Sequence, residues 1–208
     1  VAAFFGCVLR GVLPVPIDFA SDSTFARRVR QEVSAKLVAG DAAKLETLRS
    51  DLPCLRFEYF ESELSRQSVD AIDNLQPDDL LQIVFTSGTT GEPKGVVHTH
   101  RNVLASLEPI EREMRKYLKY ERWFHPIRIL HTLPLSHVFG QFMGLWIPAL
   151  LGAELHYESR LVAAELVARI HRERIYGMAA VPRVRVLLED HLLARWPGLS
   201  ARIGRATD

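Results

Sequence analysis

The stretch Thr86-Ser87-Gly88-Thr89-Thr90-Gly91-Glu92-Pro93-Lys94-Gly95 decides how the rest of this chain is understood. It follows an apolar run at residues 80–85, which predicts a buried β-strand. Residues 95–100 then alternate between apolar and polar side chains, as a second strand would. The stretch is therefore expected to form a loop between two antiparallel strands.

The composition of this loop suits an oligophosphate ligand. Glycines allow the backbone to approach a ligand closely, and successive backbone N–H groups can form a concave anion site. Hydroxyl groups add hydrogen-bond donors, and a lysine adds a positive charge. The candidate phosphate-binding residues are Thr86, Ser87, Gly88, Thr89, Thr90, Gly91 and Lys94. The plainer alternative is a flexible Gly/Thr hairpin without a ligand, because turn residues dominate any loop.

The spacing in this loop differs from that of a P-loop NTPase. A P-loop needs Lys followed by Ser or Thr and then a helix. Here Lys94 is followed by Gly95 and by a strand pattern. A P-loop NTPase is therefore the weakest interpretation.

Length and charge limit the class of protein. The chain has 208 residues, enough for one sizeable domain, and 26 Lys+Arg against 25 Asp+Glu give a net charge of +1. That balance gives no reason to expect nucleic acid binding. The basic clusters Arg27–Arg28 and Arg172–Arg174 are expected to be solvated helix faces. The cysteines Cys7 and Cys54 are expected to be buried, and the histidines show no metal-ligand spacing.

Strand and helix patterns alternate along the chain, which predicts an α/β fold with mostly parallel sheet layers flanked by helices. Helices are expected at 1–10, 22–33, 41–49, 101–120, 137–151, 161–174 and 182–196, the fourth of them kinked or split by Pro109. Strands are expected at 12–17, 36–39, 55–60, 80–85, 95–100, 128–133, 152–157 and 176–181.

A second stretch contains residues that could take part in binding or catalysis: Leu133-Pro134-Leu135-Ser136-His137-Val138-Phe139-Gly140. A strand ends here, a turn presents Ser136 and His137, and an apolar helix follows. Ligands of α/β sheets bind at the carboxyl ends of strands. The alternative for His137 is a capping or core histidine, and Ser136 is expected to be a helix N-cap rather than a nucleophile.

The string Thr-Ser-Gly-Thr-Thr-Gly-x-Pro-Lys-Gly closely resembles the signature of the AMP-forming adenylate ligases, which include acyl-CoA synthetases. That resemblance implies that residues 86–94 bind the β- and γ-phosphates of ATP. It also implies that His137, Val138, Phe139 and Gly140 line the pocket for the substrate carboxylate and its acyl group. The run that begins at Leu133 looks most like the long-chain fatty acid–CoA ligases.

The resemblance further implies that the chain is a partial AMP-binding N-terminal domain. Residues 1–79 would form a first α/β portion, and residues 80–208 would carry the phosphate loop and the acyl pocket. We find no aromatic-Gly-x-Thr-Glu motif, no Thr-Gly-Asp motif and no C-terminal domain with a late lysine. The catalytic lysine and the Mg²⁺-binding Glu of the family are thus expected outside these residues, and this portion alone is expected to be inactive.

The resemblance implies that the substrates are ATP with Mg²⁺, a fatty acid and coenzyme A. Two other hypotheses stay open: a domain that loads a carrier protein, and a truncated non-catalytic chain that binds nucleotide. The cytoplasm is the expected location, because no signal peptide or apolar stretch of membrane-spanning length is present in the sequence. Peripheral membrane association would be compatible with a hydrophobic substrate.

Overall fold

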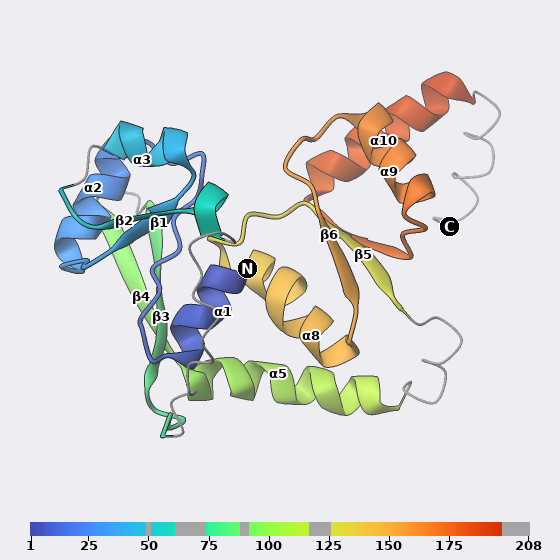
Figure 1. Cartoon of the computed structure of the whole chain (residues 1–208). Helices are drawn as coiled ribbons and strands as arrows, with labels where there is room; N and C mark the ends of the chain where they lie inside the picture. The colour runs from blue at the N-terminus through green and yellow to red at the C-terminus, as the bar shows by residue number, and fades with distance from the viewer. Residues whose placement is uncertain (49–50, 61–73, 88–91, 117–125, 197–208) are drawn as a thin grey trace. The chain divides into compact units, whose positions relative to one another are not determined.

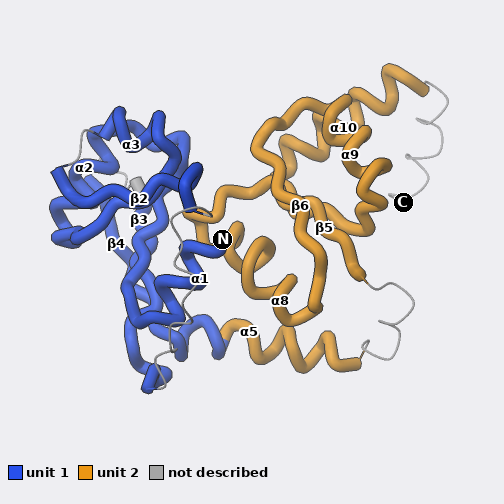
Figure 2. Tube along the Cα trace, viewed as in Figure 1, with its two compact units in different colours: residues 1–105 blue, residues 106–208 orange. Residues whose placement is uncertain are grey.

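A computed structural model describes residues 1–48, 51–60, 74–87, 92–116 and 126–196 (Figure 1). The chain divides into two compact units, Val1–Ala105 and Ser106–Asp208 (Figure 2). The boundary falls within helix α5 (His100–Arg115), and each unit is described by itself. The division at residue 79 that the family resemblance implies stays a prediction.

The first unit contains a parallel strand pair and an antiparallel hairpin, with helices between them. Its elements are α1 (Ala2–Leu9), α2 (Ser23–Glu32), β1 (Val38–Gly40), α3 (Ala42–Leu48), β2 (Cys54–Arg56), the 3₁₀ turn η1 (Phe57–Tyr59), β3 (Leu80–Ser87) and β4 (Pro93–Thr99). Helix α2 begins as predicted: the Asp22 carboxylate accepts hydrogen bonds from the backbone N–H groups of Thr24 and Phe25, at 2.7 and 2.8 Å. Its Val29 is buried, as the apolar pattern predicted.

The hairpin of β3 and β4 is the predicted pair of antiparallel strands. Leu81, Gln82, Val84 and Phe85 of β3 are buried. The amide of Gln82 has a polar partner across the ladder, because its Nε2 lies 3.2 Å from Nδ1 of His98. The hairpin is therefore anchored in the core of the first unit along most of one strand.

Two strand predictions in this unit were wrong. Residues 12–17 form no strand ladder, and one backbone hydrogen bond joins them to β3, from Ile83 N to Pro14 O at 3.2 Å. Pro14 and Pro16 have no N–H to donate, which explains why a ladder does not form. The strand predicted at residues 55–60 ends at Arg56, and the 3₁₀ turn η1 follows.

Helix α5 continues through Pro109, so this proline does not split the helix, and the predicted kink stays a prediction. A proline inside a helix removes one hydrogen bond to the carbonyl four residues earlier, here Ala105. Both residues are exposed, so water can hydrate that carbonyl. Val103 and Leu107 are buried, whereas Leu104 is 59% exposed.

The second unit is built on a parallel sheet of order β6-β5-β7, with helices packed on it. Its elements are β5 (Arg128–His131), α7 (Val138–Gln141), the π-helical segment η2 (Phe142–Trp146), α8 (Ile147–Leu151), β6 (Glu154–Tyr157), α9 (Ala163–Arg172), β7 (Gly177–Ala179) and α10 (Pro182–Arg195). Leu130, Leu166 and Val184 come from β5, α9 and α10 and form a fully buried cluster. The α/β prediction with mostly parallel sheet layers is thus confirmed.

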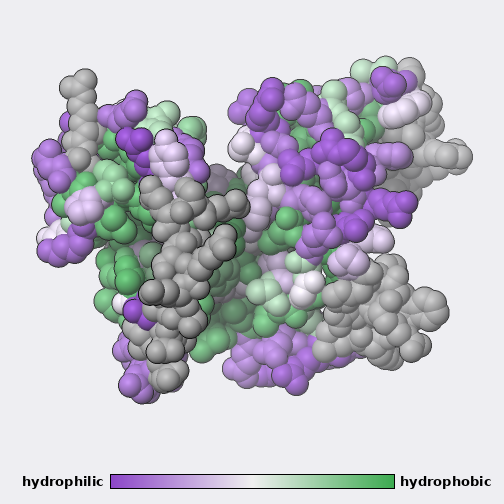
Figure 3. All heavy atoms as spheres, viewed as in Figure 1, coloured by the Kyte–Doolittle hydropathy of each residue, from purple (hydrophilic) through white to green (hydrophobic). Residues whose placement is uncertain are grey.

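Charged residues cover the outer faces of several helices. Hydrophilic residues occupy much of the visible face over α9, α10 and α5 (Figure 3). Arg27, Arg28 and Arg172 are exposed, as predicted for solvated basic clusters. Cys54 is also exposed, so its predicted burial was wrong. Within the described residues, no helix is long and apolar enough to cross a bilayer.

Candidate functional site

The turn end of the β3–β4 hairpin brings together two of the predicted phosphate-binding residues. Thr86 lies opposite Lys94 in the ladder, and Ser87 lies opposite Pro93. Directly paired residues project from the same face of a sheet, so the side chains of Thr86 and Lys94 leave the hairpin on the same face. Both residues are exposed. The strands thus extend further than predicted, since Thr86, Ser87 and Lys94 belong to them rather than to the loop.

Between the ends of the two strands, the structure describes Glu92 alone. The predicted contacts of Gly88, Thr89, Thr90 and Gly91 lie outside the described residues and stay predictions.

Gly95 has a packing role next to Lys94. A Cβ atom at this position would lie 2.9 Å from Cζ of Phe85 and 3.1 Å from Cγ2 of Ile83. The aromatic ring of Phe85 therefore lies over the backbone of β4 at this point. Since Phe85 is buried, the glycine lets the strand that carries Lys94 pack against the core.

An ion pair ties the exit of the loop to helix α2. Nη1 of Arg28 lies 3.1 Å from Oε1 of Glu92, with side chains 48% and 71% exposed. The residues are 64 positions apart. Local sequence patterns predict a solvated face for Arg28 and no role for Glu92, because this pair is a tertiary contact between residues 64 positions apart.

The second predicted stretch lies at the carboxyl end of β5, where parallel sheets bind ligands. Residues 132–137 turn away from the sheet, and α7 begins at Val138. His137 occupies the N-cap position, but its side chain forms no capping hydrogen bond. Ser136 is buried and is not the N-cap, so that prediction was wrong.

The four residues predicted to line the acyl pocket differ in accessibility. His137 is exposed, Val138 is 38% exposed and Phe139 is 64% exposed. Gly140 is buried on the opposite side, where a Cβ atom would lie 2.0 Å from the carbonyl oxygen of Pro134. The glycine therefore lets the helix pack directly against the turn. His137, Val138 and Phe139 are the members of this set that a ligand can reach.

A buried histidine lies beneath this turn. His131 is the last residue of β5 and is 2% exposed. Neither ring nitrogen has a hydrogen-bond partner among the described residues, and the ring packs edge-on against Tyr157 with centroids 5.5 Å apart. Burial lowers the pKa of His131, and the backbone of Leu133 opposes that shift with a smaller effect. Burial of the ring therefore favours the neutral form of the imidazole.

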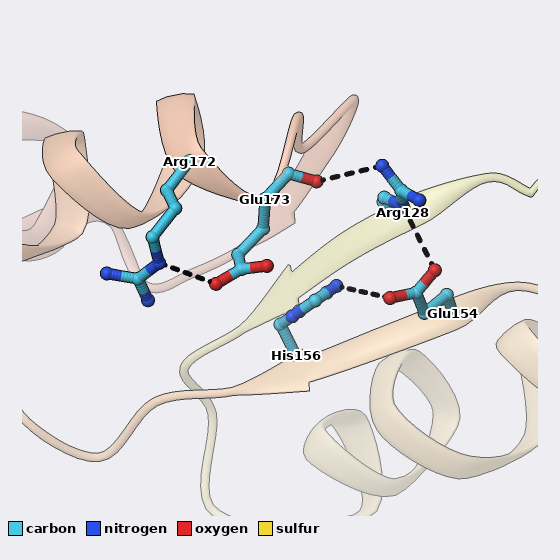
Figure 4. Close-up of polar contacts among 5 residues, drawn as sticks. All are labelled: Arg128, Glu154, His156, Arg172 and Glu173. Carbon is cyan, nitrogen blue, oxygen red and sulfur yellow. Dashed lines mark hydrogen bonds and ion pairs between the residues drawn. The ribbon is translucent and has the colours of Figure 1, made fainter.

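The charged network of the second unit lies at the other end of the sheet (Figure 4). Arg128, the first residue of β5, contacts Glu154 of β6 at 3.0 Å and the carbonyl oxygen of Glu173 at 3.4 Å. His156 Nε2 lies 3.0 Å from the same Glu154 carboxylate, and Arg172 pairs with Glu173 at 2.8 Å. The hydrogen bond from Arg128 is the main cause that lowers the pKa of Glu154. Because ligands of parallel sheets bind at the carboxyl ends of strands, we assign this network to stability rather than to a site.

The described residues contain no group of three or more His, Cys, Asp or Glu side chains that could hold a metal ion. The two candidate stretches belong to different compact units, the first to residues 1–105 and the second to residues 106–208. Each stretch therefore contributes its own set of groups: a hydroxyl and an ammonium group in the first, and an imidazole beside apolar side chains in the second.

Comparison with known proteins places these two stretches in one family. Residues 1–201 match the AMP-binding enzyme family. This chain is an AMP-binding enzyme family member. It is 27% identical to the long-chain-fatty-acid–CoA ligase ACSBG2 of Gallus gallus, over 59% of this chain and 16% of that protein. It is also 34% identical to the 4-coumarate–CoA ligase-like 3 protein of rice, over 62% of this chain and 22% of that protein.

Solved structures confirm the fold of this AMP-binding family member. The o-succinylbenzoate–CoA synthetase MenE of Bacillus subtilis, in complex with AMP, superimposes with a TM-score of 0.74 at 21% identity, over 90% of this chain and 48% of that one. The same enzyme with ATP and a magnesium ion gives a TM-score of 0.68 at 19% identity, over 88% and 37%. The chain thus spans about half of the solved chain or less, and a smaller part of the curated relatives. The predicted adenylate-ligase fold is confirmed.

Proposed function

We propose that the protein carrying this chain is an ATP-dependent carboxylic acid–CoA ligase whose acid is a long-chain fatty acid. Family membership and the cross-strand pair of Thr86 and Lys94 support this proposal. In such a ligase the carboxylate attacks the α-phosphate of ATP, pyrophosphate leaves, and the thiolate of coenzyme A then displaces AMP. The proposed location is the cytoplasm, with peripheral contact to membranes that supply the acid.

The hairpin contributes to the first step by receiving the leaving pyrophosphate. The Lys94 ammonium group supplies a positive charge, and Thr86, opposite Lys94 in the ladder, supplies a hydroxyl as hydrogen-bond donor. Both groups are carried by paired strands, so little reorganisation is needed as negative charge accumulates on the leaving group. Mg²⁺ would accompany ATP as part of the substrate. Because the described residues offer no cluster of metal ligands, we assign no step to a metal bound by them.

The turn and helix of the second unit contribute the acid-binding part. Val138 and Phe139 present apolar surface to solvent, which suits an acyl chain or an aromatic ring. His137 lies directly before them at the start of α7 and can donate a hydrogen bond to a carboxylate. The proposal of a long-chain acid rests on relatives that are named long-chain-fatty-acid–CoA ligases; another relative is named 4-coumarate–CoA ligase-like.

ATP–pyrophosphate exchange in the whole protein tests the proposal. A panel of fatty acids from short to long, with 4-coumarate, identifies the acid, and thioester formation with coenzyme A identifies the acceptor. Lys94→Ala is expected to reduce the exchange rate about 100-fold, as loss of a preorganised charge contact does. Lys36→Ala, an exposed lysine in the same unit, is the matched control. Equal rates for both variants would remove Lys94 from the site, and the absence of exchange with every acid would overturn the proposal.

A further inference from the structure

The helical run that carries Val138 and Phe139 changes its geometry after one turn. Helix α7 continues directly into the π-helical segment η2, which continues into α8. The N–H of Ile147 bonds to the carbonyl of Phe142, five residues earlier, as a π-helix requires. π-Helices occur mostly as single turns within α-helices, and such turns are frequent at functional sites.

Pro148 explains why one carbonyl of this segment needs an outside partner. In an α-helix, the carbonyl of residue 144 accepts the N–H of residue 148. Pro148 has no N–H, so Gly144 loses that donor. Gly144 is buried, so water does not readily replace the lost donor. A buried carbonyl without a partner costs free energy comparable to a lost hydrogen bond.

Tyr157 supplies the missing donor. Its hydroxyl donates to the carbonyl oxygen of Gly144 at 2.5 Å. Tyr157 is the last residue of β6, so this hydrogen bond joins the sheet to the middle of the helical run. Burial raises the pKa of Tyr157, which keeps its hydroxyl protonated and able to donate.

The same glycine fixes the distance between the helical run and the sheet. A Cβ atom on Gly144 would lie 2.6 Å from Nε2 of His131 and 2.8 Å from Cδ2 of Leu135. Gly140, one turn earlier, packs even more closely, against the carbonyl oxygen of Pro134. Residues four apart share one face of a helix, so both glycines lie on the face that contacts the β5 strand and its turn. The contacts of this face therefore set the directions in which the exposed side chains of Val138 and Phe139 point.

We propose that Tyr157 is a positioning residue for acid selectivity, because its hydrogen bond to Gly144 holds the π-helical segment that sets the direction of Val138 and Phe139. This inference rests on the proposed function, in which these two side chains contact the acyl group. Tyr157 itself does not touch the substrate. Its loss therefore changes the KM for the acid and the preference among acids, and leaves the KM for ATP unchanged.

Two measurements on Tyr157→Phe in the whole protein test the inference, with Tyr176→Phe as the control at an exposed tyrosine outside the hydrogen bond. Amide hydrogen exchange of residues 142–147 is expected to become about fivefold faster in Tyr157→Phe, the effect of losing one neutral hydrogen bond. The KM for the preferred acid is expected to rise about fivefold by the same reasoning, with the KM for ATP within about twofold of its original value.

Faster exchange with altered acid preference and an unchanged KM for ATP supports the inference. Unchanged exchange in residues 142–147 would show that the hydrogen bond from Tyr157 to Gly144 does not hold the π-helical segment. Faster exchange with unchanged acid preference overturns the positioning role. If the unaltered protein shows no ATP–pyrophosphate exchange with any acid, the proposed function fails, and the selectivity part of this inference fails with it.

Discussion

Arg28 in helix α2 and Glu92, the residue directly before β4, form an ion pair of 3.1 Å across 64 positions of sequence. The pair joins the residue next to Pro93 and Lys94 to a helix that Asp22 caps and Val29 anchors in the core. It is a tertiary contact through which α2 can influence where the proposed phosphate-binding strand end lies.

Breaking this pair is expected to have small effects of similar size on stability and on ATP binding. Because both side chains are largely exposed, Arg28→Glu should change the free energy of unfolding by about 1 kcal/mol or less. The KM for ATP should rise about threefold to fivefold, the range that corresponds to that energy. The double variant Arg28→Glu, Glu92→Arg should recover most of the loss, and steady-state kinetics at low salt measure both. A KM that stays raised in the double variant would mean that Arg28 does not act through Glu92.

Gly140 is expected to tolerate no side chain. In Gly140→Ala the new methyl group would lie 2.0 Å from a backbone oxygen of Pro134, which cannot rotate away as a side chain could. The free energy of unfolding should fall by about 3 kcal/mol, at the upper end for overpacking. Gly6→Ala in helix α1 is the matched control, since the methyl group that it adds would have no neighbouring atom within 4 Å. That control should stabilise the protein by about 0.5–1 kcal/mol, because alanine favours helix. Denaturant titration compares the two, and equal stabilities would contradict the close approach.

Phe139 is expected to matter for substrate and not for folding. Since its side chain is 64% exposed, Phe139→Ala should leave the free energy of unfolding within about 0.5 kcal/mol. The KM for the preferred acid should rise about tenfold, the effect of removing a large apolar contact. Leu145→Ala in the same helical run is the contrasting variant, because Leu145 is 3% exposed and should cost about 2–5 kcal/mol of stability. An unchanged acid preference in Phe139→Ala would remove Phe139 from the proposed pocket.

Local sequence patterns predicted most of the helices and strands, and they failed where tertiary contacts determine the structure. The hairpin, the capped start of α2 and the proline at the start of α10 follow from periodicity and from residues next to one another. The strand expected at residues 12–17 failed, because a single hydrogen bond to β3 does not make a ladder. The burial expected for Cys54 failed for a related reason: its strand is three residues long, and its side chain faces solvent.

The candidate site shows the same limit. Thr86, Lys94, His137 and Phe139 could be named from motifs, because each motif is contiguous in sequence. Arg28 and Tyr157 could not, because their partners Glu92 and Gly144 lie 64 and 13 positions away. The one local clue was Pro148, which removes a helical donor and requires a substitute from elsewhere in the fold. The sequence shows that Pro148 lacks an N–H donor, and the fold shows that Tyr157 supplies one.

His131 should make the stability of the protein depend on pH below neutrality. Burial lowers its pKa in the folded protein, so the unfolded chain binds the proton more readily. The unfolded state then carries more bound protons at acidic pH, and the free energy of unfolding falls as the pH drops below about 6.5, the ordinary value for histidine. Above that pH both states are neutral at this position, and the effect disappears.

The variant His131→Gln isolates this effect, since glutamine does not titrate. Its free energy of unfolding should be lower than that of the original protein at pH 8, because an amide in this apolar site lacks partners. The difference between the two proteins should shrink steadily between pH 7 and pH 5, as protonation of the unfolded chain destabilises the original protein alone. His171→Gln, at an exposed position of α9, is the control and should follow the original protein at every pH. Denaturant titrations at four pH values measure the difference, and a gap that stays constant from pH 8 to pH 5 would show that His131 keeps its ordinary pKa in the fold.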